Sequence, residues 1–395
     1  DLNNICKGTN PRASALVINT FGIVVQYYPE YKDRFNEDDE SYGKRLERML
    51  GIILSGLANY NTQVKQETFL VIGQYIFGSK ILQLKEKHNI FCMIYKKLLT
   101  LINEKELGDL FFFNNSSSFN HIYRFISDYE FYYKDFDIEV NKNIAFFPGT
   151  FDPFSMSHKG IVTAIRNLGY EVYLSVDEFS WSKRTQPILI RRQIARMSIA
   201  DEFGMYLFPD DISVNISNSN DLYNLKNVFS GKDVFIVVGS DVIDNASAYK
   251  NEPDSNSIHN FNHIVFSRLS REEGESDSHN ESDSNLGKIN GELVRLSLPV
   301  YLEDISSTQI RDNIDDNRDI SYLIDASAQN FIYEKSLYLR EPQYKSIIKT
   351  KSLGFYFDEA LDEEIKILIS ENIDTDKVNI DELFSKPIKV LKIVN

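Results

Sequence analysis

The stretch PGTFDPFSMSHKG, residues 148–160, follows a short strand-like run at 144–147 and opens an amphipathic segment at 161–168. A strand, a glycine turn and then a helix with a histidine in its first turn is an arrangement typical of phosphate binding. Backbone N–H groups at a helix N-terminus point at the ligand, and the helix dipole favours negative charge there. Gly149 lets a ligand approach the backbone closely, and His158 adds a donor that can carry charge near neutral pH.

A second motif, ISSTQIR at residues 305–311, makes the first one more specific. The first stretch resembles the GxFDPxHxGH signature of the nucleotidyltransferase superfamily, and ISSTQIR matches a second signature of that superfamily without change. Members of this superfamily join a nucleotide to an acceptor that bears a phosphate, and they release pyrophosphate. The two motifs occur in the expected order, and the resemblance covers about residues 143–341.

Composition restricts the class of partner and the compartment. The chain has 395 residues and a formal net charge of −15, which argues against a nucleic-acid partner, because binding a phosphate backbone needs clustered Lys and Arg. Its two cysteines, Cys6 and Cys92, form no CxxC pair. We therefore expect neither a disulfide framework nor a zinc site, and predict a cytoplasmic location. No apolar run reaches the ~20 residues that span a bilayer, so no membrane partner is expected.

Residues 1–140 are predicted to form a mostly helical domain, because apolar residues recur at spacings of three and four. The helices are expected at 13–28, 42–60, 63–75, 90–102 and 119–133. No nucleotide motif occurs in this part. Its many Phe and Tyr residues are interpreted as core, and the alternative is a groove for a protein partner or for a second copy of the chain, giving a homo-oligomer.

Residues 141–341 change character, since short β-branched runs alternate with amphipathic stretches. This alternation indicates βαβ units and a parallel sheet. We therefore predict an α/β domain with a Rossmann-like doubly wound parallel sheet. Strands are expected at 144–147, 171–176, 205–208, 234–238, 263–266 and 294–297, and helices at 158–168, 188–202, 220–229, 307–314 and 326–334.

Two further segments have a different composition. Residues 267–290 are serine-rich and acidic, with too little apolar content to pack, so a solvated loop is expected. Residues 342–395 are predicted to form a small α/β extension or the start of a further domain. Its strands are expected at 353–357 and 388–394, and its helix at 359–372. His259 and His263 lie four apart without a third ligand, and we interpret them as structural.

Both motifs are expected at the carboxyl edge of the sheet, where ligands of open α/β sheets bind. One follows the first strand and the other follows the last strand, so they are predicted to close on one triphosphate from two sides. An acceptor phosphate is already ionised at pH 7 and can attack the α-phosphorus of ATP without a general base. Positioning and neutralisation of charge are then the main needs. Mg²⁺ is expected to bridge the phosphates with few protein ligands.

Within the two motifs, polar groups are assigned to the phosphates. His158 is predicted to hydrogen-bond the α- or β-phosphate, and Ser155 to offer its hydroxyl to the same groups. Arg311 is predicted to bind phosphate oxygens bidentately. The remaining contacts with the nucleotide are expected from the glycine turn and from the start of the second motif, namely Gly149, Thr150, Phe151, Ser306, Ser307 and Thr308.

Further positions resemble nicotinate or nicotinamide mononucleotide adenylyltransferases, which make the dinucleotide precursor of NAD. The resemblance implies that Lys183, after the second strand, neutralises the acceptor or leaving-group phosphate. It implies that Asp241, which ends the run FIVVGSD at 235–241, faces ribose or ring groups, and that Tyr249 stacks on the pyridine ring. Arg268 is implied to lie near the acceptor. The substrates would then be ATP and a pyridine mononucleotide.

The sequence also departs from the family pattern. Ser155 stands where the family has His or Thr, Ser157 stands where it has Gly, and Arg268 is followed by Leu269 instead of Pro-Gly. Ser155 keeps a hydroxyl, whereas Ser157 adds a Cβ and a hydroxyl close to the expected phosphates. Two alternatives therefore stay open. One is a cytidylyltransferase acting on a phosphorylated alcohol, and the other is a nucleotide-binding regulatory module that has lost catalysis.

Overall fold

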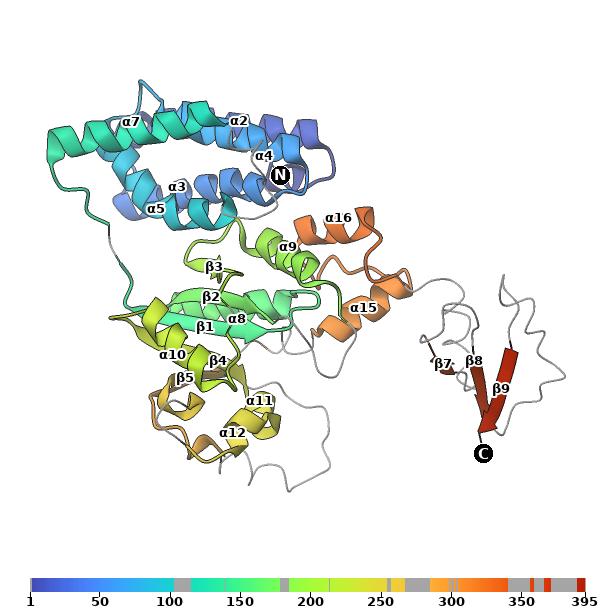
Figure 1. Ribbon diagram of the computed structural model, residues 1–395. Coiled ribbons are helices and arrows are strands. Elements are labelled where there is room, and N and C mark those ends of the chain that lie inside the picture. The colour runs from blue at the N-terminus through green and yellow to red at the C-terminus, as the bar shows by residue number, and fades with distance from the viewer. Residues whose placement is uncertain are drawn as a thin grey trace. The chain divides into compact units, whose positions relative to one another are not determined.

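Six parallel strands form the centre of the computed structural model, in the spatial order β3-β2-β1-β4-β5-β6 (Figure 1). Their bounds are β1 (Asn143–Gly149), β2 (Glu171–Val176), β3 (Met205–Leu207), β4 (Asp233–Gly239), β5 (Asn262–Phe266) and β6 (Leu293–Leu296). In this doubly wound order the chain moves from β1 to one edge and then returns to build the other edge. The predicted α/β class with a Rossmann-like parallel sheet is confirmed.

The structure describes most of the chain up to residue 339 and three strands beyond it. The described residues are 2–102, 115–138, 140–177, 185–212, 214–253, 257–266, 285–297, 299, 302, 305–339, 356–358, 366–370 and 389–394. The chain divides into two compact units, Asp1–Leu337 and Tyr338–Asn395. The parts predicted as a helical domain and a sheet domain belong to the first of these units.

The central strand β1 is buried on both faces. Its side chains Ile144 and Phe146 belong to a buried cluster that also contains Phe208 and Leu225. Ala145 and Phe147 are buried too, and they point to the opposite face because successive strand residues alternate. Burial on both faces is what a parallel sheet requires, since its crossover helices cover both sides.

Helices follow the strands and supply this cover. They are α8 (Met156–Asn167), α9 (Ile188–Ile199), α10 (Ser219–Val228), α11 (Ser240–Asn245), α12 (Ser247–Lys250), the 3₁₀ turn η4 (Ile258–Asn260), α15 (Ser307–Asp315) and α16 (Ala326–Glu334). The crossovers of the β1–β3 half and of the β4–β6 half advance in opposite directions. Right-handed connections therefore place their helices on opposite faces of the sheet.

The N-terminal part is helical, as predicted. Its elements are α1 (Leu2–Cys6), α2 (Pro11–Phe35), α3 (Asp39–Ser55), η1 (Gly56–Ala58), α4 (Thr62–Val71), η2 (Ile72–Phe77), α5 (Leu84–Ile102) and α7 (Ser116–Tyr133). Local signals set the ends of the longest helix. Asn10 accepts hydrogen bonds from the backbone N–H groups of Arg12 and Ala13, and Asn36 ends α2 in the left-handed region with φ of 50°.

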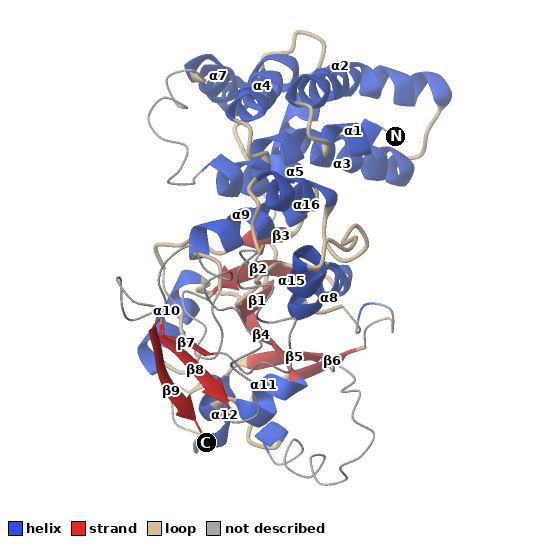
Figure 2. Ribbon diagram, turned by 90° about the vertical axis from the view of Figure 1, so that its right-hand side faces the viewer, coloured by secondary structure: helices blue, strands red, loops and turns tan. Residues whose placement is uncertain are grey.

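These helices, which we call the helical segment (residues 2–133), pack beyond the β3 edge of the sheet (Figures 1 and 2). The contact is polar as well as apolar. Lys96 of α5 forms an ion pair with the buried Glu171 of β2, and Gln193 of α9 donates to the carbonyl of Ala58 over 2.9 Å. Because this contact is close and buried, the helical segment and the sheet form one compact unit.

The predicted helix at 359–372 is wrong where the structure describes it. Residues Lys366–Ser370 form strand β8, which pairs antiparallel with β7 (Tyr356–Asp358) and parallel with β9 (Lys389–Val394). Periodicity alone does not separate a short apolar helix from a strand, and pairing on both sides decides for the strand. The strand expected at 388–394 is confirmed, and the one expected at 353–357 is described only at 356–358.

A solvated loop is predicted at 267–290. Residues 267–284 lie outside the described residues, and for residues 285–290 the prediction is wrong. Asn285 donates its side-chain amide to the carbonyl of Ile243 over 3.3 Å, and the Asn290 N–H donates to the carbonyl of His259 over 2.8 Å. Leu286 and Ile289 pack against the main buried cluster. The apolar contacts of Leu286 and Ile289, together with these two hydrogen bonds, hold residues 285–290 against the protein.

The contact between α3 and the sheet part leads to a first prediction. A Cβ added at Gly51 would lie 2.5 Å from the carbonyl oxygen of Asp201, whereas one added at Gly43 on the same helix would have nothing within 4 Å. We expect Gly51→Ala to lower the free energy of unfolding by about 1–3 kcal/mol, because the backbone must move. Gly43→Ala should raise it by about 0.5–1 kcal/mol, as alanine does inside helices.

Chemical denaturation of the two variants beside the wild type measures both changes. A Gly51→Ala variant that is as stable as Gly43→Ala would contradict the close packing of α3 on residue 201.

Candidate active site

A cavity of about 720 Å³ opens at the carboxyl edge of the sheet, above β1, β2 and β4. Its walls come from the glycine turn after β1, the ends of the neighbouring strands, the first turn of α9 and the segment after β3. The described lining consists of Phe147, Pro148, Gly149, Thr150, Phe151, His158, Ser175, Val176, Asp177, Ile188, Leu189, Arg192, Pro209, Asp210, Ile212, Val214, Asn215, Ile216, Val237, Val238, Gly239, Asp241, Val242 and Phe266. This is the edge at which the sequence predicts ligand binding.

Gly149 is needed because the next turn folds back over it. A Cβ at this position would lie 2.8 Å from the ring carbon Cζ of Phe151. Phe151 itself has φ of 46°, an uncommon value for a residue with a side chain, and its ring contacts the ring of His158 edge-on at 5.1 Å between centroids. Gly149, Thr150 and Phe151 all line the cavity, as expected for a turn that meets a ligand.

Ser155 and His158 form a reciprocal cap at the start of α8. The Ser155 hydroxyl accepts from the His158 backbone N–H over 3.3 Å, and the Ser155 backbone N–H donates to Nδ1 of His158 over 3.0 Å. Because a backbone N–H can only donate, Nδ1 is the acceptor and the neutral imidazole carries its proton on Nε2. His158 is 8% exposed and lines the cavity, so its ring is fixed both in tautomer and in direction.

Ser155 therefore replaces the hydroxyl that the family pattern places here, and its first partner is the protein itself. Its oxygen also lies 2.8 Å from Nδ1 of His158. Ser157 is 1% exposed on α8 and is not part of the described cavity lining. The expectation that the Ser157 hydroxyl lies close to the phosphates stays a prediction.

The structure brings the two motifs together. The Ser307 hydroxyl donates to the carbonyl of Pro153 over 2.8 Å, and Arg311 Nη1 donates to the carbonyl of Asp152 over 2.5 Å. Arg311 Nη2 also donates to the Thr308 hydroxyl over 3.0 Å. The second motif thus holds the turn of the first.

Ser306 has the capping role that its residue type suggests, since its hydroxyl accepts from the backbone N–H of Gln309 over 3.1 Å at the start of α15. Ser306, Ser307, Thr308 and Arg311 do not belong to the described lining of the cavity. Their direct contacts with a nucleotide remain predictions.

Asp241 lies where the sequence places it, at the end of β4 and on the cavity wall. A Cβ at Gly239 would come within 2.2 Å of the Asp241 carboxylate oxygen Oδ1. The glycine therefore leaves room for the carboxylate to fold back over the end of the strand, beside the cavity.

Tyr249 requires a correction. Its side chain is 0% exposed, and its hydroxyl lies 3.1 Å from Nε2 of His263, inside the cluster that packs beneath α11 and α12. The described cavity lining does not include it, so a stacking role on a ligand ring finds no support in this arrangement. His263 also contacts the carbonyl of Phe261 over 2.9 Å, and burial lowers its pKa to about 4. Both His259 and His263 are fully buried, in keeping with their structural interpretation.

Lys183 and Arg268 lie outside the described residues, in the stretches 178–184 and 267–284. In the part of the chain that the structure describes, no three His, Cys, Asp or Glu side chains are close enough to hold a metal ion together. The same residues include no helix that is long and apolar enough to cross a membrane.

Sequence analysis missed three charged residues of the cavity, Asp177, Arg192 and Asp210. Asp177 follows β2 directly, and its backbone N–H donates to the carbonyl of Gly149 over 3.0 Å. Burial raises the pKa of Asp177 to about 6, against a smaller opposing effect of Arg191. Arg192 is 7% exposed, lines the cavity and donates to the carbonyl of Phe208 over 3.1 Å.

A usable signal existed for Asp177, because a carboxylate directly after a parallel strand lies at the ligand edge. Arg192 gave no such signal. It is one of several cations in a predicted amphipathic helix, and only the packing of α9 shows which of them faces the cavity.

Among the comparisons with known proteins, only the comparison with solved structures gives matches. No protein-family model matches this chain, and no curated protein matches it. Two matching structures are of Plasmodium falciparum nicotinic acid mononucleotide adenylyltransferase. The one complexed with NaAD is 19% identical with a TM-score of 0.40, and the one complexed with APC is 20% identical with a TM-score of 0.39. Each match covers 50% of this chain and 97% of that protein.

The cap of α8 gives a prediction that links stability to ligand binding. Ser155→Ala removes the hydroxyl from both His158 and the helix N-terminus, so we expect a loss of about 1 kcal/mol of stability and about fivefold weaker ATP binding. Asn10→Ala, which removes the cap of α2 in the helical segment, should lose similar stability and keep the ATP affinity. Thermal melting and calorimetric titration with ATP measure both. Equal ATP affinity in the two variants would contradict the proposed orientation of His158.

Asp177 gives a prediction for pH. With a pKa of about 6, its carboxyl is neutral at pH 5 and charged at pH 7, where it repels a phosphate in the same cavity. We expect the affinity for ATP, measured without divalent cations, to fall between pH 5 and pH 7 more steeply in the wild type than in Asp177→Asn. The variant serves as the control for the titration of ATP itself. Identical pH profiles would show that Asp177 does not face the phosphates.

Proposed function

We propose that residues 143–337 transfer an adenylyl group from ATP to the phosphate of a pyridine mononucleotide, releasing pyrophosphate, as in the biosynthesis of NAD. The observation that carries this proposal is that the second signature motif is bonded to the turn of the first, whose residues line the cavity. His158 lines the cavity, and Ser307 and Arg311 bond the carbonyls of the turn that contains Asp152 and Pro153. Two independent motifs that meet at a ligand edge support nucleotidyl transfer more strongly than either motif alone.

The proposed reaction needs positioning more than proton transfer. A phosphate oxygen of the acceptor forms a new bond to the α-phosphorus of ATP, and the bond from that phosphorus to the bridging oxygen of the β-phosphate breaks. The electron pair leaves with pyrophosphate. Nε2–H of His158 donates to a phosphate oxygen on which negative charge grows, and the N-terminus of α8 adds its dipole. The fixed tautomer of His158 means that this donor requires no rearrangement during the reaction.

The acceptor would occupy the other part of the cavity. Asp241 would accept hydrogen bonds from ribose hydroxyls at the end of β4. Because Tyr249 is buried in the core, the pyridine ring would lie against the apolar lining after β3, where Ile212, Val214 and Ile216 face the cavity. Lys183 and Arg268, from the loops after β2 and β5, are proposed to neutralise phosphate charge.

Mg²⁺ would accompany ATP. The cavity offers carboxylate oxygens from Asp177, Asp210 and Asp241, and oxygen is the ligand that Mg²⁺ prefers. Because no three of the described acidic side chains are close enough to hold a metal ion together, one of these carboxylates would hold it, directly or through water, beside the phosphate oxygens of ATP. When bound, Mg²⁺ neutralises charge on the phosphates and on the departing pyrophosphate.

Release of pyrophosphate tests this proposal. We expect release from ATP with nicotinate mononucleotide or nicotinamide mononucleotide, and none with glycerol 3-phosphate. If pyrophosphate is released only with CTP and a phosphorylated alcohol, the protein is a cytidylyltransferase and the proposed adenylyl transfer is wrong. Binding of ATP without release from any pair would leave a nucleotide-binding module as the function.

The role of His158 can be measured in the same assay. His158→Ala removes a donor to the transition state, and we expect turnover to fall by about 10²-fold or more. His121→Ala is the matched control, because His121 lies on α7 in the helical segment and does not belong to the described cavity lining. A His158→Ala enzyme with near-normal turnover would remove this histidine from the mechanism.

A further inference from the structure

Helix α9 connects the cavity with the helical segment. Its first half belongs to the site, since Ile188, Leu189 and Arg192 line the cavity. Arg191, which is 1% exposed, fastens this end of the helix to the motif turn. Its Nη1 donates to the carbonyl of Thr150 over 2.6 Å, and its Nε donates to the carbonyl of Gln186 over 2.7 Å.

The second half of α9 is held from the other side. Lys97 of α5 is 1% exposed, and its ammonium group donates to the carbonyl of Ile199 over 2.8 Å and to the carbonyl of Met205. Ile199 is the last residue of α9, so Lys97 satisfies one of the carbonyls that every helix end leaves open. A cation at this end also complements the helix dipole.

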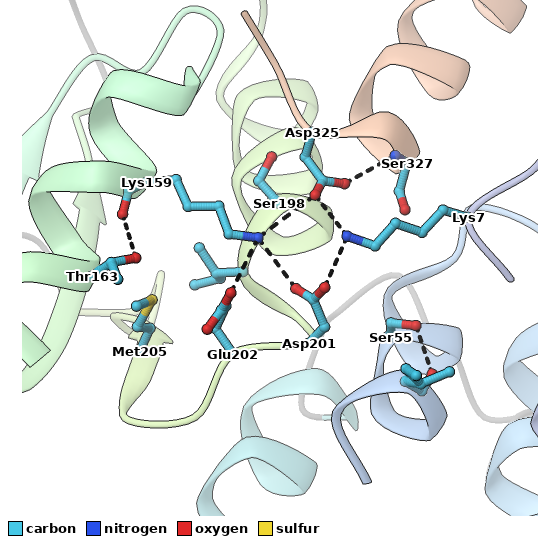
Figure 3. Close-up of polar contacts among 12 residues, drawn as sticks. Lys7, Ser55, Lys159, Thr163, Ser198, Asp201, Glu202, Met205, Asp325 and Ser327 are labelled. Carbon is cyan, nitrogen blue, oxygen red and sulfur yellow. Dashed lines mark hydrogen bonds and ion pairs between the residues drawn. The ribbon is translucent and has the colours of Figure 1, made fainter. Parts of the chain in front are cut away.

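The chain directly after α9 enters a cluster of charges, shown in Figure 3, in which Lys159 also pairs with Glu202 over 3.6 Å. Lys7 of the helical segment contacts Asp201 and Asp325, each over 2.8 Å. Lys159 of α8 contacts the same two carboxylates over 3.4 and 3.6 Å. We call Lys7, Lys159, Asp201 and Asp325 the charge ring.

The charge ring ties the end of α9 to the helix that carries His158. Its four side chains are between 7% and 16% exposed. Burial by itself raises the pKa of Asp201, but Lys159 and Lys7 outweigh it and lower the pKa to about 2. The Asp201 carboxyl is therefore charged at neutral pH, and removing Lys7 or Lys159 would leave this buried charge with one partner fewer.

These contacts give the helical segment a defined task. Lys97, Lys7 and the backbone of Ala58 hold the back of α9, while the front of the same helix presents Leu189 and Arg192 to the cavity. A helix moves as a rigid rod, so a shift at its second half displaces its first half. A displacement of about 1 Å at reacting groups can lower a rate by about 10²-fold.

We propose that the helical segment is a brace for the active site, and that Lys97 is a positioning residue that sets the cavity end of α9. The proposal rests on the proposed function for its kinetic test. It makes the N-terminal third of the chain a part of the catalytic unit, and not only a surface for a partner.

Lys97→Met tests the brace, and Lys87→Met is its matched control. Lys87 lies on the same helix α5, is 8% exposed, and also donates to two carbonyls, those of Phe77 over 2.9 Å and Ser79 over 2.6 Å. Both of its acceptors belong to the helical segment. Pyrophosphate release is measured at a temperature at which both variants are fully folded. We expect Lys97→Met to lose about 10- to 100-fold in turnover and Lys87→Met to stay within about twofold of the wild type.

Hydrogen exchange supplies a readout that does not depend on turnover. The backbone amides of residues 188–199 should exchange faster in Lys97→Met than in the wild type. Their exchange rates should be unchanged in Lys87→Met. If Lys97→Met melts earlier but keeps wild-type turnover and exchange, its role is structural only and the proposal is overturned. Equal losses in the two variants overturn it as well, because they would reflect general destabilisation.

Failure of the proposed function can be distinguished from failure of the brace. If the wild type releases no pyrophosphate from any substrate pair, the proposed function fails, and calorimetric titration with ATP then replaces turnover. The brace predicts an affinity for ATP at least about tenfold weaker in Lys97→Met than in Lys87→Met, and equal affinities overturn it. If Lys97→Met does not fold, Gln193→Met removes the bond to Ala58 and is judged by the same criteria.

Discussion

The parallel pairing of β1 with β2 on one side and with β4 on the other is the constraint on which the cavity depends. Because these strands run in the same direction, the residues that follow them emerge at one edge, where Gly149, Asp177 and Asp241 line the same space. The chain leaves β1 toward one edge of the sheet and returns to build the other. The connecting helices therefore diverge to opposite faces, and the edge between them stays open.

Both motifs serve the architecture of this edge. In the first motif the Phe151 ring covers Gly149, and Ser155 fixes the His158 ring. In the second motif the donors of Ser307 and Arg311 are bonded to carbonyls of the first motif's turn. Position 155 thus supplies both a backbone N–H and a hydroxyl that contact Nδ1 of His158.

Cations of the helical segment meet oxygen atoms of the sheet part across a buried contact. Lys96 pairs with Glu171, Lys7 pairs with Asp201, and Lys97 bonds the carbonyl at the end of α9. In a chain with a net charge of −15, Lys96 and Lys7 lie where they compensate carboxylates of the sheet part. Separating the two parts would leave these charges without partners, which is unfavourable in a low-dielectric contact. The helical segment and the sheet thus depend on each other.

The sequence by itself determined the strands of the sheet, the order of its elements and the glycine turn after β1, because these follow from periodicity, glycine and capping signals within a few residues of each other. Gly149 and His158 belong to this group. Only the tertiary structure decided that burial raises the pKa of Asp177, that Arg192 faces the cavity, that Tyr249 is buried and that 366–370 is a strand. Each of these outcomes depends on partners far away in the chain, and a local pattern carries no information about burial or pairing with distant segments.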